Sequence, residues 1–316
     1  MEEVISVKNL TRDYGKGRGV FGVSFDVKRG EVFGFVGTNG SGKTTILRHI
    51  MGFLKAQTGE VKVLNLDAWN DSRDLKKYIE YIPGEIAFPD LKDGTTFLKN
   101  QAELLGIHDM SYAKNLIKRL QLDPSANLKR MSKGMKQKTA IVAGLMADKE
   151  ILILDEPTNG LDPLMRETFL EIILEEKRKG KTIIMSSQMF DELELTCDKV
   201  ALILNGKIVD IADVNEIKNS KYKTLKIEFI NEKDYKDFKK LRYKIVRDQP
   251  QYNQVTVKVA DKNVNKLFSQ IKQCPLKFIN ETKQTLERYF QEQLFKAKTQ
   301  SIKDIKYRKK EKRHVK

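Results

Sequence analysis

Cysteine is scarce in this sequence, and long apolar runs are absent. The two cysteines, Cys197 and Cys274, lie far apart and form no C-x-x-C pair, so the sequence indicates neither a disulfide framework nor a zinc site. A reducing cytosol is the expected compartment. No run of about 18 apolar residues occurs, and residues 1–4 lack the basic start and apolar core of a signal peptide. The sequence therefore predicts a protein that does not itself span a membrane.

Excess charge of either sign is absent from the first two thirds of the chain. Residues 1–220 carry 32 Lys and Arg against 32 Asp and Glu, whereas residues 221–316 carry 27 against 11 and account for the whole net charge of +16. With 316 residues, of which 40% are hydrophobic, the chain is long enough for two domains with real cores. We therefore predict a domain boundary near residue 220.

A glycine-rich loop lies between a predicted strand over 31–37 and a predicted helix over 44–53. Residues 37–45 read Gly-Thr-Asn-Gly-Ser-Gly-Lys-Thr-Thr and fit the phosphate-loop pattern G-x-x-x-x-G-K-[ST] at every fixed position. Its glycines let phosphate oxygens approach backbone N–H groups. Lys43 is expected to bind the β- and γ-phosphates, and the Thr44 hydroxyl to ligate Mg²⁺. The predicted nucleotide-binding residues of the loop are Gly37, Asn39, Gly40, Ser41, Gly42, Lys43, Thr44 and Thr45. The alternative is a glycine-rich turn that matches by chance.

Two adjacent carboxylates end a second buried strand. Residues 151–157 read Ile-Leu-Ile-Leu-Asp-Glu-Pro, which is typical of a parallel strand covered on both faces. Beside a phosphate loop, Asp155 can hold the Mg²⁺ hydration shell, and Glu156 can polarise the attacking water as general base. Two exposed acids at a strand end are the alternative. A helix over 164–179 and a strand over 181–187 follow.

The segment from about 90 to 145 has helical periodicity and predicts a helical insert in an α/β frame. Within it, Ser132 and Gly134 precede a helix predicted over 138–147. The start of this helix could receive an anion, or the serine could simply cap it.

The C-terminal region predicts a small ferredoxin-like domain, because its elements follow the order strand, helix, strand, strand, helix, strand. These elements are expected at 224–230, 232–241, 243–247, 255–260, 263–272 and 276–279, followed by a closing helix at 285–295.

Residues 1–220 resemble the nucleotide-binding subunit of an ABC transporter. The loop at 37–44 matches the Walker A motif, and residues 151–156 match the Walker B motif with its catalytic glutamate. Further matches are Tyr14 at the adenine-stacking position, Asp162 in the D-loop, and Ser132, Lys133 and Gly134 in the signature that contacts the ATP of a partner subunit. The resemblance implies a P-loop ATPase of the ABC type, with a parallel core sheet, an N-terminal antiparallel part and the helical insert.

The sequence departs from the family pattern at three places. The signature reads Met-Ser-Lys-Gly-Met at 131–135, and the Q-loop glutamine corresponds to Gly84, with Glu85 as a partial substitute. The switch histidine, which contacts the γ-phosphate in the family, is Gln188. Gln can donate a hydrogen bond but cannot carry a proton or positive charge. We therefore predict slow but real ATP hydrolysis.

The resemblance implies that ATP and Mg²⁺ are the cofactors and that two ATPase subunits, identical or different, sandwich two nucleotides. A separate membrane-spanning permease would be driven from the cytoplasmic side of the membrane. The altered signature, the Pro-Gly-Glu Q-loop and the basic extension favour a bacterial exporter. The rival functions are a nucleotide-sensing regulator with little or no hydrolysis, and a soluble ABC ATPase acting on ribosomes or nucleic acid.

The positive charge of the C-terminal third divides between a basic accessory domain at 221–302 and a densely basic tail at 303–316, predicted to be disordered. This charge could be a solvated surface, a contact with anionic lipid head groups, or a contact with nucleic acid. Of these, nucleic acid is the least favoured.

Overall fold

The computed structural model describes residues 2–295, so the predicted basic tail at 303–316 lies outside the described residues. The chain separates into two compact units, Met1–Val214 and Asn215–Lys316. The division falls six residues before the position at which the charge balance changes. Each unit has its own sheet and hydrophobic core.

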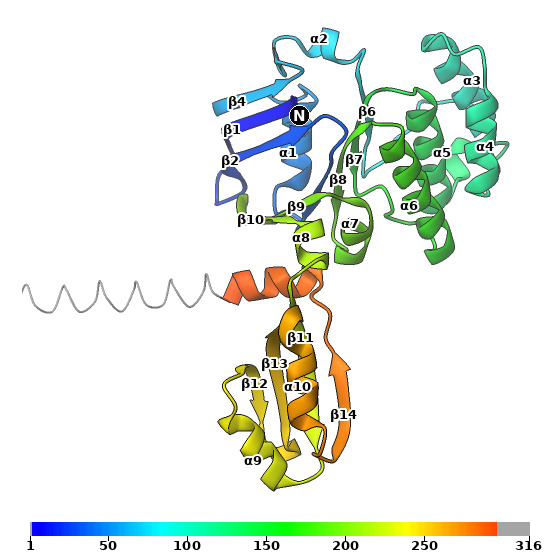
Figure 1. Ribbon diagram of the computed structural model, residues 1–316. Coiled ribbons are helices and arrows are strands. Elements are labelled where there is room, and N and C mark those ends of the chain that lie inside the picture. The colour runs from blue at the N-terminus through cyan, green and yellow to red at the C-terminus, as the bar shows by residue number, and fades with distance from the viewer. Residues whose placement is uncertain (1, 296–316) are drawn as a thin grey trace, which may run out of the picture. The chain divides into compact units, whose positions relative to one another are not determined.

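The first unit is built on a six-stranded sheet (Figure 1). Its strands are β3 (Val32–Val36), β6 (Ile79–Ile82), β7 (Ile151–Asp155), β8 (Thr182–Ser187), β9 (Lys199–Leu204) and β10 (Lys207–Asp213), in the order β10-β9-β3-β8-β7-β6. All neighbours are parallel except β9 and β10. Strands β3, β7 and β8 are buried along their whole length, which explains their largely apolar sequences.

A second, antiparallel sheet packs against the core sheet. It contains β1 (Glu3–Asp13), β2 (Gly19–Lys28), β4 (Thr58–Val63) and β5 (Leu66–Asp67), in the order β2-β1-β4-β5. The ring of Phe25 in β2 lies 5.1 Å from each of the rings of Phe33 and Phe35 in β3. Helix α1 (Lys43–Ile50) buries its apolar face in the same cluster. The loop between β3 and α1 is thus held at both ends by the core.

Several of the remaining helices up to residue 218 begin at a side-chain cap. Their bounds are α2 (Ser72–Leu75), α3 (Gly94–Leu104), α4 (Ser111–Arg119), η1 (Leu128–Arg130), α5 (Lys133–Met146), α6 (Pro163–Arg178), α7 (Phe190–Thr196) and α8 (Val214–Lys218). The Ser132 hydroxyl accepts a hydrogen bond from Met135 N at 3.2 Å and caps α5. Because of this cap, α5 begins five residues earlier than predicted.

The second unit has the predicted ferredoxin-like topology. Its elements are β11 (Tyr222–Phe229), α9 (Glu232–Lys240), β12 (Lys244–Gln249), η2 (Pro250–Tyr252), β13 (Gln254–Ala260), η3 (Asp261–Asn263), α10 (Val264–Ile271) and β14 (Leu276–Glu281), followed by a helical stretch at 286–295. The strands form an antiparallel sheet in the order β12-β13-β11-β14. Helices α9 and α10 share one hydrophobic core with one face of this sheet.

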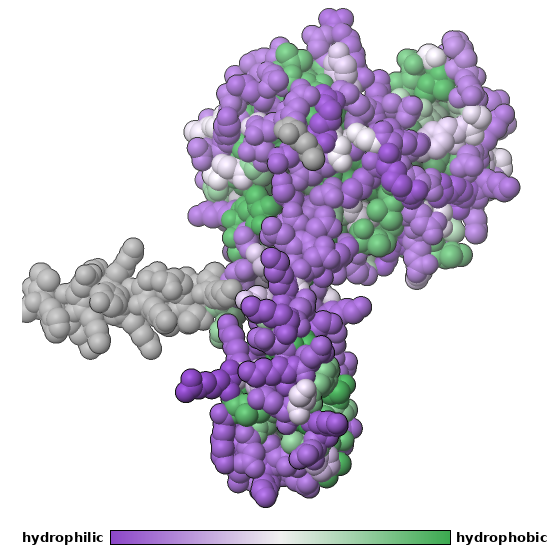
Figure 2. Space-filling model, viewed as in Figure 1, coloured by the Kyte–Doolittle hydropathy of each residue, from purple (hydrophilic) through white to green (hydrophobic). Residues whose placement is uncertain are grey.

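The two units expose mainly polar residues on the side that Figure 2 shows, with small separate hydrophobic patches. Within residues 2–295, no helix is both long and apolar enough to cross a membrane.

Candidate functional site

The glycine-rich loop connects the carboxyl end of β3 to the start of α1. A Cβ atom at Gly37 would lie 2.5 Å from the carbonyl oxygen of Ile203, so only glycine fits against β9 there. Gly40 and Gly42 have φ angles of +76° and +112°, which side chains rarely allow. The loop can therefore hold its backbone in a conformation that other residues would not adopt.

This loop has the properties of a phosphate cradle. The backbone N–H groups of the first turn of α1 have no partner within the helix and lie at its positive end. The Ser41 hydroxyl is 3% exposed and, among the described residues, has no hydrogen-bond partner. A buried donor without a partner is costly unless a ligand satisfies it, and a phosphate oxygen would do so. Asn39 is exposed, while Thr44 and Thr45 are partly buried.

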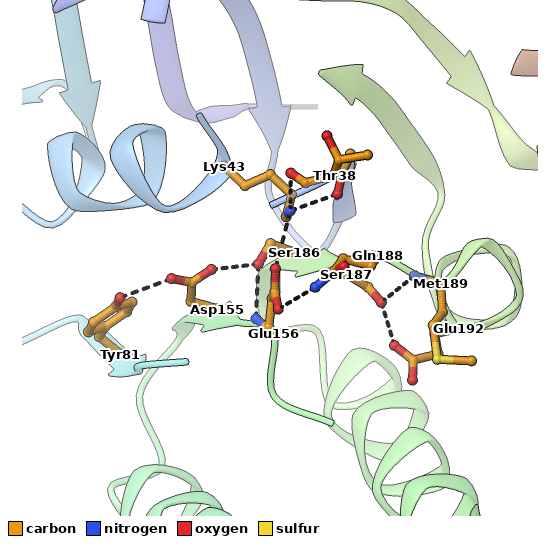
Figure 3. Close-up of polar contacts among 11 residues, drawn as sticks. Thr38, Lys43, Tyr81, Asp155, Glu156, Ser186, Ser187, Gln188, Met189 and Glu192 are labelled. Carbon is orange, nitrogen blue, oxygen red and sulfur yellow. Dashed lines mark hydrogen bonds and ion pairs between the residues drawn. The ribbon is translucent and has the colours of Figure 1, made fainter. Parts of the chain in front are cut away.

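Lys43 lies beside Thr38 and above Ser186 in Figure 3 and is 3% exposed. Its Nζ donates to the carbonyl oxygens of Gly37, at 2.7 Å, and Thr38, at 3.2 Å. The same Nζ lies 3.2 Å from Glu156 Oε1. The first turn of α1 and the end of β7 are thus joined by an ion pair at the site.

Asp155 is fixed at the end of β7 by two hydroxyl groups (Figure 3). Ser186 Oγ donates to Asp155 Oδ1 at 2.7 Å, and the Tyr81 hydroxyl donates to Oδ2 at 3.5 Å. Burial, together with the negative charge of Asp155, raises the pKa of Tyr81 to about 12, so this hydroxyl keeps its proton at neutral pH. Sequence reasoning identified neither hydroxyl as part of the site.

Glu156 adopts a left-handed backbone conformation, with φ of 47°. Its backbone N–H donates to Ser186 Oγ at 2.9 Å, and its carbonyl accepts from Asn159 N at 3.0 Å. A non-glycine residue in this conformation is strained, and such strain is often found at functional sites. Ser186 therefore holds the Asp155 carboxylate and the backbone of Glu156, because the same hydroxyl donates to Asp155 Oδ1 and accepts from the Glu156 N–H.

Gln188 points its amide at the predicted general base. Its Nε2 donates to Glu156 Oε2 at 2.9 Å (Figure 3). The two oxygens of Glu156 are thus divided between Lys43 and Gln188. Lys43, Glu156 and Gln188 therefore form a continuous chain of polar contacts, although they come from three separate segments of the protein.

Glu192 in α7 is a third polar residue that sequence reasoning missed, after Ser186 and Tyr81. It is 1% exposed, and its Oε2 accepts from Ser187 Oγ at 2.6 Å and from Thr158 Oγ1 at 3.0 Å. Arg166 Nε lies 3.3 Å from its Oε1. This carboxylate therefore links the residue before Gln188 to the segment after Glu156. The only sequence signal was an acid on the buried face of a helix that had not been predicted.

The predicted signature residues contact the loop after β7. Lys133 Nζ donates to Asn159 Oδ1 at 2.8 Å, and a Cβ at Gly134 would lie 2.7 Å from the carbonyl oxygen of Gly160. The side-chain oxygen Oδ1 of Asp162 accepts a hydrogen bond from Met165 N at 3.0 Å and caps α6.

Gly84 and Glu85 line a pocket of about 400 Å³ together with Lys133 and Asn159. A Cβ at Gly84 would lie 3.0 Å from the carbonyl oxygen of Asp155, so the segment that contains Gly84 is in close contact with the end of β7.

Tyr14 lies elsewhere, in the turn between β1 and β2. It is 44% exposed, and the Arg12 guanidinium lies 5.5 Å from its ring centre.

Comparisons with known proteins agree with this geometry. A family model described as ABC transporter matches residues 20–159. An uncharacterized ABC transporter ATP-binding protein of Bacillus subtilis, YhcH, is 32% identical over 236 residues, which cover 68% of this chain and 72% of that protein. The chain belongs to the ABC transporter ATP-binding family.

Further relatives of this ABC ATPase are consistent with that assignment. The bacitracin transport ATP-binding protein BcrA of Bacillus licheniformis is 30% identical and covers 72% of this chain and 76% of its own length. A solved ATP-binding subunit of an ABC transporter matches with a TM-score of 0.61 at 28% identity, over 68% of this chain and 92% of that one. The predicted fold class is confirmed, and the chain is an ATP-binding subunit with ATPase chemistry.

Proposed function

We propose that this ABC ATPase hydrolyses ATP slowly and thereby powers export through a separate membrane-spanning permease. The observation that carries the proposal is the contact between Gln188 and Glu156. Glu156, the proposed general base, accepts a hydrogen bond from the amide of Gln188, which stands at the position of the switch histidine.

Each residue of the site has a proposed role. Lys43 would bind the β- and γ-phosphates, and Glu156 would accept a proton from the attacking water. Thr44 and Asp155 would hold Mg²⁺, which neutralises charge that develops on the phosphates. Mg²⁺ is usually held by one or two carboxylates and the nucleotide, and Asp155 is the carboxylate proposed for that role here.

We further propose that two ATPase subunits, identical or different, act together. Ser132, Lys133 and Gly134 would contact the nucleotide of the partner subunit, because α5 begins with a capped N-terminus suited to an anion. In the described chain this helix start packs against residues 159–160. Tyr14 is proposed to stack on adenine, and Gly84 with Glu85 to form the altered Q-loop.

We propose that this ATP-binding subunit belongs to an exporter and lies on the cytoplasmic side of the membrane. Some relatives carry transport names, as the bacitracin transport protein does, and the altered signature and Q-loop support the same direction. Contact of the basic C-terminal region with anionic lipid remains a proposal. The tail that carries most of that argument lies outside the described residues.

Copurification tests the transporter assignment. The full chain, solubilised in mild detergent from nuclease-treated membranes of the native host, is expected to bring down an integral membrane protein in a fixed ratio. Recovery with ribosomes, and with no integral protein, would favour the soluble ABC ATPase instead.

A nucleotide-sensing regulator is the second candidate, and the engagement of Gln188 with Glu156 favours it as well. Gln188→His separates the two functions. We expect the ATPase rate of the assembled complex to rise on the order of a hundredfold, because one preorganised donor near the γ-phosphate is restored. Gln188→Ala serves as the control, since it frees Glu156 without supplying a donor. An unchanged rate in the His variant would contradict the slow-enzyme proposal.

A further inference from the structure

Helices α9 and α10 both pack on the same face of the sheet of the second unit. Alternation along the strands places Leu225, Ile227 and Phe229 of β11 on the face that packs against α9 and α10. The intervening residues point to the opposite face, which we call the open face. Neither α9 nor α10 packs on this face, because their buried residues belong to the core on the other side of the sheet.

Strand register gathers basic residues on the open face. One cross-strand row joins Thr224, Lys258 and Lys244, and the next joins Asn280, Lys226, Thr256 and Arg247. A bulge between Ile245 and Arg247 keeps both Lys244 and Arg247 on this side. Adjacent rows lie about 7 Å apart.

The four basic residues of these rows form no close ion pair within residues 2–295, although the charge of Lys226 helps to lower the pKa of Glu228. Lys226, Lys244, Arg247 and Lys258 take part in none of the ion pairs found among residues 2–295. Lys244 stands directly opposite Lys258, an arrangement that is destabilising unless an anion lies between the two charges. The neighbouring Glu228 adds little negative charge to the face, since Lys277 Nζ lies 2.7 Å from it and Gln254 donates to it.

Two aromatic rings flank the basic rows. Tyr222 is 54% exposed, with Lys258 Nζ 5.3 Å from its ring centre, and Lys226 Nζ lies 5.4 Å from the ring centre of Phe278. Each ring thus stands beside a cation. A ring that can stack on a base and a cation that can contact the adjoining phosphate are the combination used by single-strand binding surfaces.

Composition alone favours nucleic acid least among the partners of this region, but from the strand register and the flanking rings we propose that the open face binds single-stranded RNA. Anionic lipid would need only the cations, whereas the hydroxyl groups of Thr224 and Thr256 and the amide of Asn280, placed between the cations, suit base edges and sugar hydroxyls. A four-stranded sheet with helices on one side is an established platform for stacking unpaired bases. The central strands carry Lys and Thr in place of aromatic residues, so binding is dominated by phosphate contacts and has little sequence preference. This inference goes beyond the proposed transport function and does not rest on it.

The test uses the full chain and a fluorescently labelled unstructured RNA of 12 nucleotides. The face variant is Lys244→Gln/Arg247→Gln/Lys258→Gln. The matched control is Lys233→Gln/Lys262→Gln/Lys266→Gln, which removes the same charge from exposed positions on or beside the helices of the same unit. Both variants keep the basic tail, so its contribution to binding cancels.

We expect the face variant to lose at least tenfold in affinity at 100 mM salt and the control to lose less than about twofold. The slope of log affinity against log salt should fall by about 2 in the face variant only. Equal losses in the two variants, or no loss in either, would overturn the proposal.

Variants of Tyr222 and binding to two other ligands, double-stranded RNA and lipid vesicles, test the proposal independently. Tyr222→Ala is expected to weaken binding about fivefold or more, whereas Tyr222→Phe keeps the ring and should stay within twofold of the parent. The same RNA annealed to its complement should bind at least tenfold more weakly. If the face variant instead loses affinity for phosphatidylserine vesicles while RNA binding is unchanged, the open face is a lipid site and the proposal is wrong.

Discussion

Glu156→Gln is expected to lower ATP turnover on the order of a thousandfold while ATP remains bound. General base catalysis typically contributes about 10²–10⁴-fold, and the amide cannot accept the proton of the attacking water. The substitution preserves side-chain volume, so the neighbours of Glu156 should stay in place. Single-turnover phosphate release and equilibrium binding of ATP measure the two effects separately.

Glu156→Gln is also expected to change the orientation of the Gln188 amide, because the two side chains share a hydrogen bond. In the parent, both Lys43 Nζ and Gln188 Nε2 donate to the carboxylate. An amide at 156 can accept from Lys43 with its oxygen, but its NH₂ group then faces the NH₂ group of Gln188. Gln188 must rotate its amide so that its oxygen accepts.

Glu156→Gln combined with Gln188→Ala removes that rearrangement. If loss of the base alone explains the slow turnover, the double variant should be as slow as the single variant. Near-parental turnover in Glu156→Gln would show that another residue accepts the proton, and would contradict the assignment of Glu156.

The sequence predicted the loop and the strand ends of this site because both depend on local rules. A phosphate loop needs glycine at fixed positions, and a strand buried on both faces needs an unbroken apolar run. Strands β9 and β10 were missed because a short apolar run such as residues 199–204 fits a helix or a strand equally well. Only pairing with β3 decides between them.

The partners of the predicted residues could not be read from the sequence. Ser186, Tyr81 and Glu192 belong to no motif, and their contacts depend on how β6, β7, β8 and α7 are placed beside one another. The basic rows of the second unit are a similar case. The topology follows from the order of elements, but the register that sets Lys244 opposite Lys258 depends on one bulge in β12.

Lys43→Met is expected to weaken ATP binding a hundredfold or more. Charge-assisted hydrogen bonds contribute about 1.5–3 kcal/mol each, and about 1.4 kcal/mol corresponds to a factor of ten in affinity. Lys43 would make such bonds to two phosphates, so losing both accounts for at least two decades. Fluorescence titration with a labelled ATP analogue measures the change, and Lys43→Ala should show the same loss.

The two substitutions at Lys43 differ in what they do to the nucleotide-free protein, and this difference separates binding from folding. Methionine fills nearly the same buried volume, whereas alanine leaves a gap beside Gly37 and Thr38. Glu156 loses its ion-pair partner in both variants, but its side chain is 17% exposed and can be hydrated. Thermal melting without nucleotide should therefore be lower for Lys43→Ala than for Lys43→Met, while ATP affinity is lost equally. If the Met variant binds ATP as the parent does, the charge of Lys43 does not hold the phosphates.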